Sequence, residues 1–100
     1  RLFRTKVRIE TPNDTPSEAI KSFHTQNIER ALDSLKNDDV SEREITSIMM
    51  PADSEKLEEA KQKIRNFAKE MAGFLQAGKK EKVYSLNIQL FPQTEDESYA

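Results

Sequence analysis

Residues 83–92 decide the predicted fold, and they read Val-Tyr-Ser-Leu-Asn-Ile-Gln-Leu-Phe-Pro. From Tyr84 to Leu90 apolar and polar residues alternate, which is period two and typical of a half-buried β-strand. Pro92 ends the stretch because proline has no backbone N–H to donate to a sheet. The sequence therefore predicts a strand over residues 83–91.

Two other stretches also predict strands. In residues 3–10 the pattern alternates again, with Phe3, Thr5, Val7 and Ile9 on one face. Residues 44–50 are short, partly β-branched and stopped by Pro51. The chain is thus expected to contain three strands.

Helical patterns lie between these strands. Thr15-Pro-Ser-Glu18 is a capping box with proline at the first helical position, and Asn37 to Asp39 end the helix that it begins. Asp53 is expected to cap the second helix, and Gly78 is a suitable C-cap. Each helix carries one apolar stripe: Ile20, Phe23, Ile28, Ala31, Leu32 and Leu35 in the first, and Leu57, Ala60, Ile64, Phe67, Ala68, Met71 and Leu75 in the second.

The predicted order is therefore βαβαβ. Helices on both sides of the sheet would require strands that are apolar on both faces, and these strands have one apolar face. We therefore expect an α+β fold, a two-layer sandwich in which both helices cover one face of a small sheet. The side of the last strand that carries Ser85, Asn87 and Gln89 would then be open.

Composition excludes several classes of protein. With 100 residues, 35% hydrophobic and 34% charged, the chain forms one modest domain. A net charge of −2 argues against a generally basic surface for nucleic acid. No apolar run is long enough to span a membrane. We expect a cytoplasmic protein. There is no cysteine and only one histidine, so we expect no metal site. No serine lies in a GxSxG-like elbow, and the paired carboxylates lie at helix ends or in the tail, so we expect a non-enzymatic protein with no cofactor.

His24 and Asn27 are unusual because both fall inside the apolar stripe of the first helix, at about 100° per residue. They could be buried polar groups that satisfy each other or the backbone, or the helix could break near Phe23. They could also line a polar ligand pocket between helix and sheet. A catalytic histidine is the weakest of these alternatives.

The open strand face suggests a partner. Neutral amides suit a covered face, because they hydrogen-bond across an interface where a buried unpaired charge would be costly. We therefore predict a homodimer through this face, with an interface of Val83, Ser85, Asn87, Gln89 and Phe91. An exposed polar face is the alternative.

Several stretches resemble the Fibrobacter-type paralogous family, an uncharacterised bacterial family with a domain of unknown function. They are Arg43-Glu-Ile-Thr-Ser-Ile, Ile64-Arg-Asn-Phe, the last strand through Pro92, and the first helix with Phe23-His24 and Ala31-Leu32. The resemblance covers residues 18–93. The polar positions that match the family's motifs are His24, Arg43, Glu44, Asn87 and Gln89.

Members of that family look like transcription regulators with helix-turn-helix and winged-helix-like regions before this segment. The resemblance implies that residues 1–14 are the end of such a region, with the first strand and a linker. Residues 15–100 would be a non-enzymatic C-terminal regulatory or dimerisation domain with a frayed acidic tail over 93–100. DNA would be bound only through the upstream regions. The alternative is an effector-sensing domain with a small-molecule site around His24, Asn27, Arg43 and Glu44.

Overall fold

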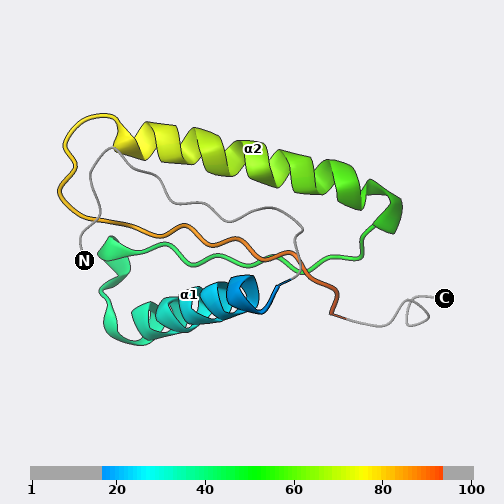
Figure 1. Cartoon of the computed structure of the whole chain (residues 1–100), viewed down its shortest axis with the longest axis horizontal. Coiled ribbons are helices and arrows are strands. Elements are labelled where there is room, and N and C mark those ends of the chain that lie inside the picture. The colour runs from blue at the N-terminus through cyan, green and yellow to red at the C-terminus, as the bar shows by residue number, and fades with distance from the viewer. Residues whose placement is uncertain (1–16, 94–100) are drawn as a thin grey trace.

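The computed structural model describes residues 17–93, which contain four helical elements (Figure 1). In chain order they are α1 (Glu18–Asn37), η1 (Val40–Glu42), η2 (Ser54–Lys56) and α2 (Leu57–Gln76). The predicted strand over residues 3–10 lies outside the described residues, as does almost all of the predicted acidic tail.

Helix α1 begins at a serine cap. The hydroxyl oxygen of Ser17 accepts a hydrogen bond from the backbone N–H of Ile20 at 3.0 Å, and Ser17 itself is extended. This bond satisfies one of the backbone donors that the first turn leaves without a helical partner. The cap is therefore Ser17, where the sequence predicted Thr15. The end at Asn37 is confirmed, with Asp38 as the C-cap.

Helix α2 begins as predicted from Asp53. The Asp53 carboxylate accepts the backbone N–H of Glu55 at 3.0 Å, which starts the 3₁₀ turn η2, and η2 leads directly into α2. Gly78 follows the C-cap residue Ala77 and has a φ of 93°, a left-handed conformation that favours glycine. Asp53 thus caps the 3₁₀ turn that leads into α2, whereas the N-cap of α2 itself is Lys56, and Gly78 lies one residue after the C-cap.

The predicted α+β sandwich is wrong. No residue between 17 and 93 is in a β-strand, and the described part of the chain is helical where it is regular. Residues 44–50 and 83–91 are extended, but no backbone hydrogen bond joins the segments 43–53 and 79–93. An alternating pattern favours an extended chain with two different faces, whereas a strand also requires a backbone ladder to a neighbour.

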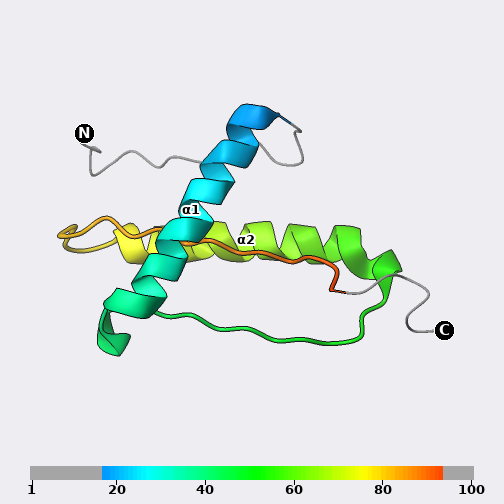
Figure 2. The same cartoon turned by 90° about the horizontal axis from the view of Figure 1, so that it is seen from below.

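The expected placement of both helices on one face is also wrong. In both views the extended segment 80–92 passes between α1 and α2, which lie on opposite sides of it (Figures 1 and 2). No Cα atom of α1 lies within 8 Å of a Cα atom of α2. The polar face of segment 83–91 was expected to be open, but Asn87 lies against α1, whereas Ser85 and Gln89 on the same face are exposed.

The two extended segments run in the same direction and are joined by side chains at both ends. At one end Lys82 forms an ion pair with Glu42 at 2.9 Å, and at the other Gln93 Nε2 lies 3.7 Å from the sulfur of Met49. Helix α2 connects the far end of the first segment to the near end of the second (Figure 1).

None of the described residues is fully buried. The apolar stripes that were expected to form a core are half-buried or exposed. Examples are Phe23, Ile28, Leu32 and Leu35 in α1 and Leu57, Phe67 and Leu75 in α2.

Candidate functional site

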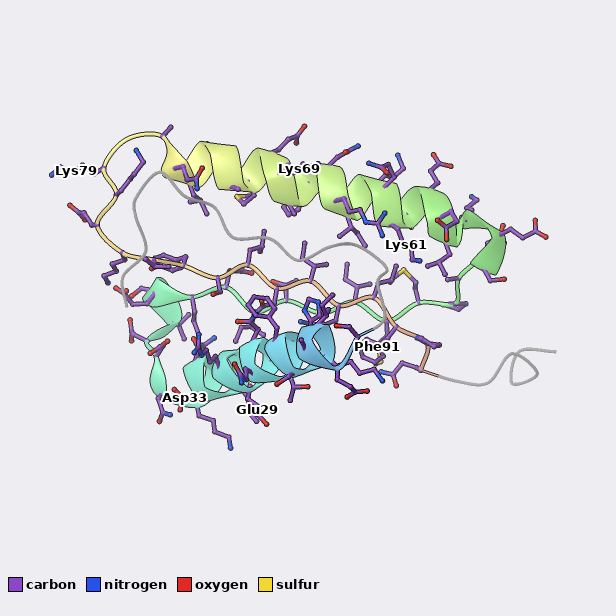
Figure 3. The ribbon with its side chains drawn as sticks, viewed as in Figure 1. Glu29, Asp33, Lys61, Lys69, Lys79 and Phe91 are labelled. Carbon is purple, nitrogen blue, oxygen red and sulfur yellow. The ribbon has the colours of Figure 1, made fainter. Side chains whose placement is uncertain are left out.

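Helix α1 meets the extended segments through a face that is displaced from its apolar stripe. Its half-buried residues are Ile20, Asn27, Ala31 and Ser34, whereas Ile28, Leu32 and Leu35 lie to one side and are about half exposed. Glu29 and Asp33 point away from the extended segments (Figure 3). The packed face of α1 is thus small and partly polar, and its larger apolar side chains remain accessible.

A hydrogen bond between two asparagines holds α1 to segment 83–91. The side-chain amide of Asn87 donates to the backbone carbonyl of Asn27 at 3.3 Å, and both residues are half-buried. A carbonyl oxygen has two lone pairs, so it accepts this bond in addition to the helical one. The structure therefore brings together two predicted site residues, one from the predicted pocket and one from the predicted dimer interface.

Segment 83–91 presents different residues to the two helices. Phe91 lies on the α1 side, as does Asn87 four residues earlier (Figure 3). Alternation places Leu86, Ile88 and Leu90 on the opposite side, and all three are exposed. Of the other predicted interface residues, Val83, Ser85, Gln89 and Phe91 are exposed.

The four predicted ligand-binding residues do not form one site. His24 is exposed, and its ring makes an edge contact with Phe23 at 5.7 Å. Arg43 is half-buried at the other end of α1, where its Nε donates to the carbonyl of Asp38 at 3.3 Å. The helical rise separates Asp38 from His24 by about 20 Å. Glu44 is exposed and accepts a hydrogen bond from Thr46.

A cluster of polar contacts joins the 3₁₀ turn η1 to segment 79–93. Asp39 caps this 3₁₀ turn, and hydrogen bonds from the hydroxyl and then the backbone N–H of Ser41 lower the pKa of its carboxyl. Glu42 binds segment 79–93 twice, through its carboxylate to Lys82 and through its carbonyl, which accepts from Tyr84 Oη at 3.3 Å. The bond to Glu42 raises the pKa of Lys82.

Sequence reasoning missed this cluster. Glu42 and Lys82 are 40 residues apart, and nothing in the local pattern of either residue indicates the other. These contacts fix the corner between α1 and the last extended segment, and they serve the fold rather than a ligand.

The described residues expose large apolar side chains on both helices and both extended segments. Ile48, Met49 and Phe74 are at least 75% exposed, and none of the described residues is fully buried. Exposed apolar surface of this kind marks an interaction surface.

Neither a metal centre nor a membrane span emerges from the described residues. Between residues 17 and 93, no three His, Cys, Asp or Glu side chains gather in a way that could hold a metal ion. In the same range, neither α1 nor α2 is apolar enough to cross a bilayer.

Between residues 17 and 93 the chain thus forms two α-helices that are separated by extended segments, and it is rich in exposed apolar side chains. The chain belongs to the family described as a domain of unknown function (DUF4423), whose model matches residues 1–92. The resemblance noted in the sequence is thus confirmed at the level of an uncharacterised domain. Neither a curated protein nor a solved structure matches the chain.

Proposed function

We propose that this chain is a non-enzymatic regulatory domain that dimerises a bacterial transcription regulator in the cytoplasm. The observation that carries self-association is the exposure of large apolar side chains among the described residues. Phe67 is 48% exposed, Phe74 is 75% exposed and Ile48 is 76% exposed, and no described residue is fully buried. Exposed apolar side chains in this number mark an interaction surface.

The role in transcription is supported by the sequence resemblance. The similar proteins look like regulators that carry helix-turn-helix and winged-helix-like regions before the segment that corresponds to this chain. Dimerisation suits such proteins, because the two-fold symmetry of a dimer matches two half-sites in an operator.

An effector-sensing domain is the alternative, and it has less support. It would need His24, Asn27, Arg43 and Glu44 to share a site, and α1 holds the first and third of these about 20 Å apart. The carbonyl of Asn27 also accepts the amide of Asn87 from within the chain.

DNA binding tests the proposal. The whole gene product, with the regions that the resemblance implies upstream, should bind a fragment of its own promoter as a dimer that protects two half-sites. The 100-residue chain alone should bind duplex DNA weakly or not at all, because its net charge is −2. Electrophoretic mobility shifts at several salt concentrations measure DNA binding by the whole gene product and by the 100-residue chain. Tight, salt-dependent binding by the 100-residue chain alone would contradict the proposal, and so would a whole gene product that binds no DNA.

A further inference from the structure

A seam of apolar residues runs the length of α2 at alternating spacings of three and four residues. Its members are Leu57, Ala60, Ile64, Phe67, Met71 and Phe74. This is the 3.5-residue period with which one α-helix packs against another in a coiled coil. In a helix of 20 residues the seam spans about three heptads.

The seam lies on the flank of α2. The half-buried residues of α2 are Ala60, Lys61, Ile64, Arg65, Ala68, Met71, Ala72 and Gln76, and Lys61 is on the side of the extended segments (Figure 3). At about 100° per residue, the middle of the seam is rotated roughly 70° from the middle of this group, and Ala60, Ile64 and Met71 belong to both. A second helix that packs on the seam would therefore lie beside α2, in the same layer.

The seam is open where its largest side chains lie. Phe67 is 48% exposed and Phe74 is 75% exposed, and Leu57 at the start of the helix is 43% exposed. The smaller members of the seam, together with Met71, are half-buried. Exposed aromatic side chains of this kind are frequent anchors of interfaces.

The seam complements a second copy of itself in the antiparallel direction. With a two-fold axis between Arg65 and Asn66, the seam forms layers that place larger residues opposite smaller ones. These layers are Leu57 against Phe74 of the second copy, Ala60 against its Met71, and Ile64 against its Phe67. Facing large and small side chains is how helix interfaces reach the packing density of protein interiors.

The charges beside the seam favour the same arrangement. Lys63 and Glu70 border the seam on one side, seven residues apart. In the antiparallel register Lys63 lies within about 3 Å, measured along the axis, of Glu70 of the second copy, and the pair occurs twice by symmetry. In a parallel register Lys63 would face Ala68 and Glu70 would face Leu75, so neither charge would find a partner.

Lys63 is free to make this contact. Its ammonium is 4.0 Å from Glu59 within α2, and both side chains are 75% exposed. An exposed ion pair within one helix is weak, so Lys63 exchanges it for a pair across the interface at little cost.

We propose that α2 is the dimerisation helix of this domain, and that it packs antiparallel against α2 of a second copy through this seam. The inference rests on the proposed function and adds the surface and the direction of pairing. The exposed side chains that this contact would bury are Leu57, Phe67 and Phe74.

A charge exchange between Lys63 and Glu70 tests the direction and the surface together. In Lys63→Glu, and likewise in Glu70→Lys, the homodimer brings two like-charge pairs together. Each homodimer should therefore dissociate with a Kd raised about ten-fold. When the two variants are mixed, both contacts of the heterodimer become attractive again. Heterodimers should then exceed the half that random mixing gives.

Native mass spectrometry of an equimolar mixture, in which one variant carries a tag, gives the relative amounts of the two homodimers and the heterodimer. Lys69→Glu is the matched control: it makes the same change of charge on the face of α2 opposite the seam, and it should leave Kd unchanged and show no preference for the heterodimer. A change in helix stability alone weakens both homodimers without favouring the heterodimer.

The outcomes separate this inference from the proposed function. A wild-type chain that stays monomeric overturns both. A wild-type dimer whose Lys63→Glu and Glu70→Lys variants mix at random overturns the antiparallel seam and leaves self-association standing. Phe67→Glu gives a second reading, because a carboxylate in the middle layer should abolish the dimer while circular dichroism shows that the helices remain.

Discussion

At the scale of single residues, the structure depends on polar groups that tie extended segments to helices. Asn87 holds α1, and Glu42 holds Lys82 and Tyr84 at the corner. The sequence singled out Asn27 and Asn87, because amides in otherwise apolar or uncharged settings are unusual. It did not show that they bind each other, since the distance of 60 residues between them is bridged only by the fold.

Asn87→Ala should lower the free energy of unfolding by about 1 kcal/mol, because it removes the donor to the carbonyl of Asn27. Urea unfolding followed by circular dichroism measures the loss. Gln89→Ala is the control: this exposed amide is two residues away on the same segment, and its removal should change little. If the two substitutions lower the free energy of unfolding equally, the hydrogen bond between Asn87 and α1 does not contribute to stability.

The carboxyl group of Asp39 should make the free energy of unfolding depend on pH in the acid range. Its pKa in the folded chain is below the ordinary 3.8, mainly because Ser41 donates to the carboxylate. A lowered pKa adds stability above 3.8 that disappears as the pH falls through the folded value. Asp39→Asn keeps an acceptor for the cap but does not titrate. We expect the wild type to lose more stability than this variant when urea unfolding is compared at neutral pH and below 3.8. Parallel losses would contradict the role of Ser41.

At the scale of elements, the sequence predicted the helices well and the strands badly. Helix signals are local: the cap at Asp53, the end at Asn37 and the 3.6-residue period of the apolar stripe in α2 all lie within the segment that they describe. Strand pairing is not local. Alternation in residues 83–91 correctly indicated an extended segment with two faces, but it carried no information on a partner or on which side each helix lies.

Replacing either of two glycines with alanine, one inside α2 and one just after it, should change the stability of the chain in opposite directions. Gly73 is inside the helix and an added Cβ meets nothing within 4 Å, so Gly73→Ala should stabilise α2 by about 1 kcal/mol. Gly78 is equally open but has a φ of 93°, so Gly78→Ala should destabilise the chain by about 1 kcal/mol. Thermal unfolding at one fixed protein concentration measures both. The same sign for both variants would contradict this description of the end of α2.

At the scale of the whole molecule, the distribution of apolar surface is the central feature. Between residues 17 and 93, α1 and α2 do not pack on each other's stripes, and no residue is fully buried. The expectation of a compact two-layer core was wrong because it assumed that both stripes meet one sheet. The sequence did contain the pattern of the proposed seam, but Phe74, its most exposed member, was not among the residues assigned to the stripe of the second helix.

The measurement that tests self-association most directly is sedimentation equilibrium of the chain over a range of concentrations. The account predicts a mass that rises with concentration to about 23 kDa, twice the 11.5 kDa of one chain. It also predicts that Phe67→Glu stays near 11.5 kDa over the same range. A wild-type mass of 11.5 kDa at every concentration up to about 100 μM, well above the Kd of a standard interface, would contradict the account.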